Sequence, residues 1–220
     1  MRESQQDNSA RPFGGVMSKG SNSQKQLLRL ERLTDLVYAL VIWRIFMMLP
    51  RPSFDNPEWE TVADMLISEW AGFVVPLLAI LIVIVYWLQS NSLLSKLKGT
   101  NALHTGISIF QVFFVLFYLY ALGLGIGVGS ADDTRVLESS AAVLVGACAY
   151  LGWWYACRKG ALLADDVSDA EAKKIAKANF AEPMTALLTI PAAFIGPWAW
   201  ELSWFIYPFL KRWFRRSQTQ

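Results

Sequence analysis

The sequence predicts an all-α integral membrane protein, a six-helix bundle that crosses the bilayer six times. Of its 220 residues, 54% are hydrophobic and 14% are aromatic, whereas the apolar share of soluble domains is roughly 45–50%. These residues lie in blocks, several of which approach the ~20 apolar residues that span ~30 Å of hydrocarbon as a helix. Basic and acidic connecting segments alternate along the chain. The three observations together indicate a polytopic fold.

Five apolar blocks define the predicted spans. Their approximate ranges are 33–49, 70–88, 103–128, 136–157 and 180–210. The first block stops at Pro50, because proline cannot continue a helix and also restricts the residue before it. The last block is interrupted at Gly196-Pro197. This interruption is either a kink in one long span or a turn between two short spans, 182–195 and 198–210.

Positively charged residues favour the turn, since cytoplasmic segments are enriched in lysine and arginine near span ends. The basic positions are Lys19, Lys25, Arg29, Arg32, Lys96, Lys98, Arg158, Lys159, Lys173, Lys174, Lys177, Lys211, Arg212, Arg215 and Arg216. The alternate segments are acidic, and one of them carries Arg135 beside Asp132, Asp133 and Glu138. A basic N-terminal region and a basic tail require an even number of crossings, with both termini in the cytoplasm.

The segments outside the spans are polar. Residues 1–28 lack the apolar core of a signal peptide, so we expect a disordered cytosolic arm that begins at either Met1 or Met17. The six-span domain is predicted over 29–212, and a basic cytosolic tail over 213–220. Short loops and the lack of a targeting peptide favour a prokaryotic plasma membrane.

A separate amphipathic helix is predicted at the cytosolic surface over residues 165–178. Ser168 is the expected N-cap, and Glu171 stands where it completes a capping box. Lysines follow on the same segment, which is typical of a solvated helix end.

Several classes of function are disfavoured. The sequence has no Walker loop, GxSxG elbow, HExxH or CxxC motif, so an enzyme is not expected. The single histidine, His104, leaves no metal cluster, and the two cysteines, Cys148 and Cys157, are interpreted as packing thiols. A net charge of +2 does not indicate nucleic-acid binding. No cofactor and no metal site are predicted.

Charged residues inside the predicted spans are functional candidates by default, because an uncompensated charge in hydrocarbon is costly. Arg29 and Asp35 stand at the cytosolic edge of the first span, where they either tie this helix to others or are solvated at the interface. The candidate partners are Trp87, Gln89, Ser90, Asn91, Asn101 and His104. Glu201 lies in the last span and is either functional or snorkels to the outer interface.

A family resemblance rests on the same segment. Arg29-x-x-x-Leu33-Thr34-Asp35 resembles the Arg-x-x-x-Phe-Ser-Asp signature that begins the first helix of the transmembrane protein 175 family of lysosomal and prokaryotic potassium channels. The aromatic pair Tyr86-Trp87 is similar to a pair that ends the second helix of that family. The resemblance extends over residues 28–210.

The resemblance implies a homotetrameric potassium channel with no cofactor, in which potassium is the permeant ion. First helices surround the pore in this family, and apolar side chains narrow it in place of a carbonyl filter. Helical spacing puts Leu36, Leu40, Trp43 and Met47 on one stripe. The resemblance places the constriction at Leu40. The alternative is a stripe buried in ordinary helix packing.

The sequence also departs from the family pattern. Leu33-Thr34 replaces Phe-Ser, Ser90 and Asn91 replace histidines, and Trp43 replaces a threonine. Arg44 lies close to the stripe, where a ring of basic residues would repel cations, and we expect it to turn sideways and pair with Glu69 or Glu201. The resulting prediction is a potassium-permeable cation channel in the lipid bilayer. An ion-coupled secondary transporter and a non-conducting membrane scaffold remain the alternatives.

Overall fold

The computed structural model describes residues 15–51, 61–128, 131–159 and 162–216. Within these ranges the chain forms helices and no strand, apart from one isolated bridge between Leu97 and Leu163. The helices are α1 (Gly15–Phe46), α2 (Val62–Ser68), α3 (Trp70–Leu94), α4 (Ala102–Val128), α5 (Asp132–Lys159), α6 (Asp169–Ala193), α7 (Pro197–Ser203) and α8 (Ile206–Arg216). The predicted all-α fold class is confirmed.

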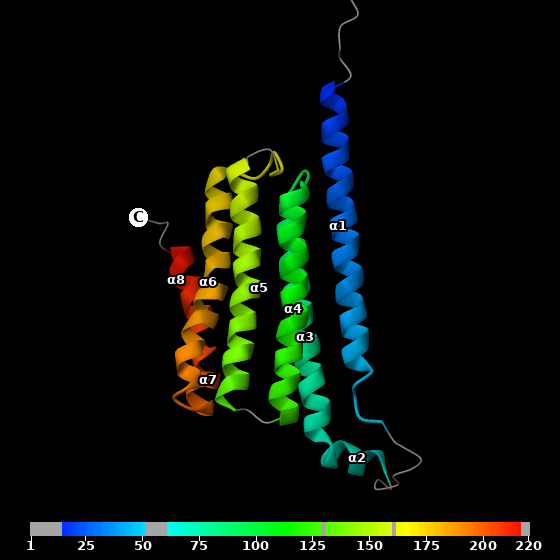
Figure 1. Ribbon diagram of the computed structural model, residues 1–220, viewed down its shortest axis with the longest axis vertical. Coiled ribbons are helices and arrows are strands. Elements are labelled where there is room, and N and C mark those ends of the chain that lie inside the picture. Colours follow the sequence, from blue (N-terminus) through cyan, green and yellow to red (C-terminus); the bar gives the residue numbers. More distant parts are fainter. Residues whose placement is uncertain (1–14, 52–60, 129–130, 160–161, 217–220) are drawn as a thin grey trace, which may run out of the picture.

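The long helices run side by side and reverse direction at each connection (Figure 1). Three of them are long and apolar enough to cross a membrane, within 72–94 of α3, 102–125 of α4 and 132–158 of α5. The other predicted spans lie in α1, α6 and the α7–α8 pair. Helix α1 and the first half of α6 carry many charges, and α7 and α8 are short. Length and apolar composition alone therefore do not mark these helices as spans.

The interruption at Gly196 is a turn. Helix α6 ends at Ala193, and Gly196 adopts a φ of 146°, a value that residues with a side chain rarely reach. Pro197 then begins α7, and the chain runs back along α6 (Figure 1). The ring of Phe214 in α8 lies 5.8 Å from the ring of Phe180 near the middle of α6, so α7 and α8 together return along about half of α6.

The predicted arm over residues 1–28 is wrong from Gly15 onward, where α1 begins; residues 1–14 lie outside the described part. Leu27 and Leu30 are buried in a cluster with α3, α5 and α6. The Ser23 hydroxyl donates to the Thr100 carbonyl at 2.7 Å. These contacts order a segment whose polar composition suggested disorder. Of the predicted tail, residues up to 216 belong to α8, and 217–220 are outside the described residues.

The predicted surface helix over 165–178 is the first part of α6 and not a separate element. Ser168 caps it as expected, since its hydroxyl accepts from the Glu171 amide at 3.2 Å. The Glu171 carboxylate pairs with Lys96 at 2.6 Å and does not complete the capping box. The helix continues through Pro183 to Ala193, because its second half buries small residues against α5.

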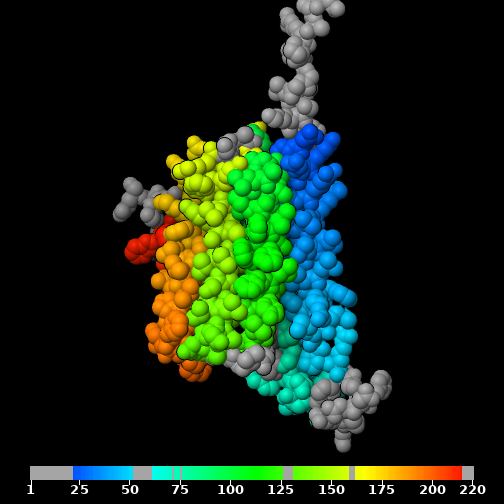
Figure 2. Space-filling view, viewed as in Figure 1, coloured from blue at the N-terminus to red at the C-terminus, as the bar shows by residue number. Residues whose placement is uncertain are grey.

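Close packing joins α4, α5, α6 and α7 into one body. Ser139 of α5 accepts hydrogen bonds from Thr189 of α6 at 2.7 Å and from Trp200 of α7 at 2.9 Å. At the other end of the bundle, the Trp153 indole donates to the Ala172 carbonyl at 2.9 Å. Helix α1 lies at one edge of the bundle and packs mainly against α3 and α4 (Figure 2). The position of α1 leaves much of its surface uncovered within a single chain.

Candidate functional site

Helix α1 has a buried and an exposed face. Tyr38 is 2% exposed and packs among α3, α4 and α5. Leu40 and Trp43 are 54% and 59% exposed, and Leu36 and Met47 are exposed beside them. The four residues of the predicted stripe therefore share one uncovered face. Helix packing within a single chain therefore does not cover this stripe.

Asp35 anchors α1 to α3. The Trp87 indole nitrogen donates a hydrogen bond of 2.8 Å to the Asp35 carboxylate. These two residues were named as partners from sequence alone. Arg29 and Leu33 are exposed and border a small hollow between α1 and the start of α4. Within the described residues, no hydrogen bond or ion pair joins Arg29 to Asp35, so the motif does not act as an internal pair.

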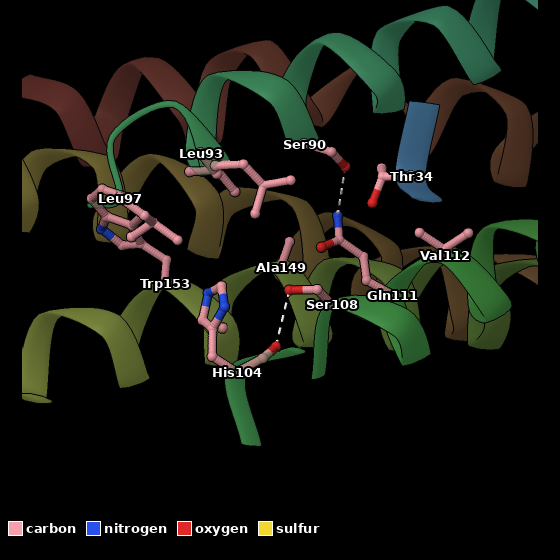
Figure 3. Close-up of a pocket in the computed structure, with 12 residues that line it drawn as sticks. Thr34, Ser90, Leu93, Leu97, His104, Ser108, Gln111, Val112, Ala149 and Trp153 are labelled. Atoms are coloured by element: carbon pink, nitrogen blue, oxygen red, sulfur yellow. Dashed lines mark hydrogen bonds between the residues drawn. The ribbon is translucent and has the colours of Figure 1, made fainter. Parts of the chain in front are cut away.

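Behind the anchored segment, a polar cavity of about 30 Å³ lies where α1, α3, α4 and α5 meet (Figure 3). It holds Thr34, Ser90 and His104 from the predicted set, together with Ser108 and Gln111. The volume has room for a water or two, since one water needs roughly 10–15 Å³ measured in this way. The cavity therefore brings polar side chains of α1, α3 and α4 together between the helices.

The hydrogen bonds around the cavity connect three helices. The Gln111 amide donates to the Ser90 hydroxyl at 3.5 Å, and the Tyr38 hydroxyl lies 3.3 Å from the same oxygen (Figure 3 shows the first of these contacts). The His104 Nδ1 atom lies 2.9 Å from the Thr100 hydroxyl. Tyr38 and Gln111 were missed by the sequence analysis. A polar Gln111 within the apolar run of residues 107–117 was the available signal.

The remaining candidates of the network lie outside this cavity. Asn101 accepts from the His104 amide at 3.0 Å, and its own side-chain amide donates to the Tyr155 hydroxyl at 3.0 Å. Asn91 is half-buried and does not line the cavity. Gln89 reaches α6 and donates to Glu182 at 2.9 Å. The predicted partners therefore serve four separate contacts: Trp87 with Asp35, Ser90 and His104 at the cavity, Asn101 with Tyr155, and Gln89 with Glu182.

The intramembrane charges are placed differently from expectation. Arg44 is exposed on α1, and among the described residues no ion pair joins it to Glu69 or Glu201. Glu201 is exposed on α7 and borders a second, larger cavity. Glu138 was assigned to an outer loop but lies buried within α5, as does Arg135. Hydropathy alone did not reveal this, because both residues stand at the start of a span.

We expect removal of the Asp35 carboxylate to weaken the attachment of α1. Asp35→Ala should cost about 1 kcal/mol, the usual net value of one hydrogen bond, and should lower the melting temperature of the solubilised protein. Trp87→Phe should give a similar loss, and the double variant should lose no more than either single variant. Glu31→Ala, on the preceding turn of α1, is the matched control. Additive losses in the double variant would contradict the pairing.

These features define a class of protein. The chain has long apolar helices, many exposed apolar side chains on their surfaces and polar groups buried between them. This combination of features is that of a polytopic helical membrane protein. In this chain, helix α1 lies at the edge of the bundle, is joined to α3 by the hydrogen bond between Asp35 and Trp87, and leaves an apolar face uncovered.

Comparison with solved structures identifies the fold. A homolog of the lysosomal potassium-selective channel TMEM175 from Chamaesiphon minutus superposes with a TM-score of 0.65 at 18% identity, covering 90% of this chain and 100% of that chain. A variant of the potassium channel MtTMEM175, in complex with a nanobody fusion protein, has a TM-score of 0.63 at 21% identity, covering 87% of this chain and 93% of that chain. The predicted resemblance is confirmed at the level of the fold.

No protein-family model matches the sequence, and no curated protein sequence matches it.

Proposed function

We propose that the protein is a potassium-permeable cation channel, assembled as a homotetramer in which four α1 helices surround the pore. The fold carries this proposal, because the chain superposes on the whole of a protein described as a homolog of a potassium-selective channel. The uncovered apolar face of α1 supports it. Transport is passive in this proposal and needs no covalent cycle and no cofactor. Both termini lie in the cytoplasm of a prokaryotic cell.

The exposed face of α1 supplies the constriction in this proposal. Leu40 forms the narrowest ring, and Leu36, Trp43 and Met47 form neighbouring rings along the same face. Narrow apolar walls offer no hydrogen bonds to water, so they can close a pore to a hydrated ion by dewetting. Asp35 with its partner Trp87, and the polar cavity behind Thr34, hold α1 at a fixed rotation relative to α3.

Potassium and sodium flux into proteoliposomes tests the function. The purified native chain should pass potassium faster than sodium, down the gradient and without a coupled ion. Empty liposomes give the background, and light scattering of the solubilised protein gives the subunit number. Saturable exchange with steep pH dependence would favour a secondary transporter instead. Background flux for both ions would favour a non-conducting scaffold.

We expect Arg44 to slow cation passage. It is exposed near Leu40, and no pairing within the described residues neutralises it, so four copies would place positive charge close to the conduction path. Arg44→Gln should therefore raise potassium flux at low ionic strength. The gain should shrink at high salt, where charges are screened over about 3 Å at 1 M. Arg32→Gln, on the cytosolic part of α1, is the control. An equal gain at both salt concentrations would contradict a through-space effect.

A further inference from the structure

A second cavity, of about 720 Å³, is lined by residues of α3, α4, α5, α6, α7 and α8. Its volume lies in the range of small-molecule sites, roughly 300–1,000 Å³. It is far larger than the polar cavity behind Thr34 and shares none of that cavity's lining residues. Neither the proposed pore face nor the anchor at Asp35 borders it, so the conduction proposal does not account for it.

The cavity wall carries more negative than positive groups. Glu138, Glu182 and Glu201 border it, each from a different helix, and Arg135 is the basic residue among its described lining residues. Arg135 forms an ion pair with Asp132, which does not line the cavity. The wall is left with an excess of carboxylates, which suits a cation.

Glu182 points to the place of that cation. Its Oε2 atom accepts from the Gln89 amide at 2.9 Å, and the Tyr86 side chain is close enough to interact with the same carboxyl. Its Oε1 atom is shielded from solvent and receives no hydrogen bond. An acceptor buried without a donor is costly, because it has lost its water and gained nothing in return. A ligand that carries a positive charge would remove this cost.

The rest of the wall is apolar and aromatic. Leu78, Leu81 and Phe205 are more than half exposed at its border, which opens the cavity toward the hydrocarbon. Deeper in the cavity, the rings of Tyr86 and Tyr118 are 6.5 Å apart and meet edge to face. Aromatic faces attract organic cations, most strongly where water is excluded. A small metal ion would instead need several oxygen ligands around it.

We propose that this cavity binds an amphipathic organic cation, with an alkylammonium group at Glu182 and its chain along the leucines of α3. The ligand reaches the cavity from the bilayer. Tyr86 and Tyr118 flank the headgroup, and the Gln89 amide holds the Glu182 carboxylate in position. Binding in this cavity does not require that the protein conduct ions.

Equilibrium binding of tritiated hexylammonium to the full chain in phosphocholine nanodiscs tests the proposal. We expect saturable binding of one molecule per subunit, with empty nanodiscs giving the partition background. Glu182→Gln should weaken binding about tenfold, equivalent to ~1.4 kcal/mol. Asp166→Asn removes an exposed carboxylate outside the cavity and should leave binding unchanged. Equal binding by the native chain and Glu182→Gln would overturn the proposal.

A second variant tests the cavity without changing its charge. A Cβ atom on Gly125, which lines the cavity, meets open space, so Gly125→Phe should fill the cavity and abolish binding while leaving the elution profile unchanged. The uncharged isostere heptane, with a methyl group in place of the ammonium, should not compete. Competition by this isostere would overturn the assignment to a cation. Displacement by millimolar potassium would show an inorganic ion site and overturn the ligand class. Because the readout is binding, it is separate from the flux measurements.

Discussion

Proteoliposomes that contain the Leu40→Asn variant should take up potassium severalfold faster than those with the native chain. Leu40 is 54% exposed on the uncovered face of α1, and in the proposed tetramer four such side chains meet at the pore axis. Asparagine is similar in size but carries an amide that binds water. Water retained at the ring lowers the barrier that an apolar constriction sets against a hydrated ion.

The control for this experiment is Leu187→Asn on α6. Leu187 is 50% exposed, so the two variants place the same amide on an equally uncovered helix face. Flux that rises in both variants would indicate a damaged bilayer seal rather than an opened pore. Flux that rises in Trp43→Asn but not in Leu40→Asn would move the constriction to the next turn of the same face. Background flux in all variants would contradict the channel.

Gly146→Ala should destabilise the protein by about 1–3 kcal/mol, the usual cost of overpacking. A Cβ atom on Gly146 of α5 would lie 2.8 Å from both the nitrogen and the Cδ atom of Pro183 in α6, and 3.2 Å from the Cγ atom of Glu182. The ring of Pro183 is bonded to its own backbone nitrogen, so it cannot rotate away from an added methyl group. The two helices must therefore separate, and the hydrogen bonds that join them at Ser139 and Trp153 would be strained.

The matched control is Gly123→Ala on α4, where no heavy atom lies within 4 Å of the added Cβ. There the change should be neutral or stabilising, because alanine is roughly 0.5–1 kcal/mol better than glycine inside a helix. The melting temperature of the solubilised protein, followed by loss of the monodisperse elution peak, measures both. A melting temperature for Gly146→Ala equal to or above that of the native chain would contradict close α5–α6 contact.

The approximate ranges of the helices were largely predictable from hydropathy and charge together, whereas the polar contacts were only partly so. Asp35 and Trp87 could be paired because each stands at the same edge of its span, and charges at that depth need partners. Glu182 and Glu138 could not be placed together, since they lie 44 residues apart in sequence by their numbers. Only the packing of α5 on α6 brings both to one cavity.

Local composition also misjudged the ends of helices. The polar stretch before Leu27 has no hydrophobic periodicity, yet α1 begins at Gly15 because its buried leucines and Ser23 find partners on other helices. Likewise, the charged segment after Ser168 looks solvated but continues into α6. In both places, contacts distant in sequence extend a helix that local propensity leaves undecided.

By itself the sequence determined the helical membrane class, the approximate spans and the side of α1 that stays apolar. These follow from hydrophobic blocks, charge alternation and helical period, which are local properties of the chain. The tertiary structure alone decided that α1 leaves its stripe uncovered and that three glutamates border one cavity. Such features depend on which helices become neighbours, and that choice is made by packing between residues far apart in the chain.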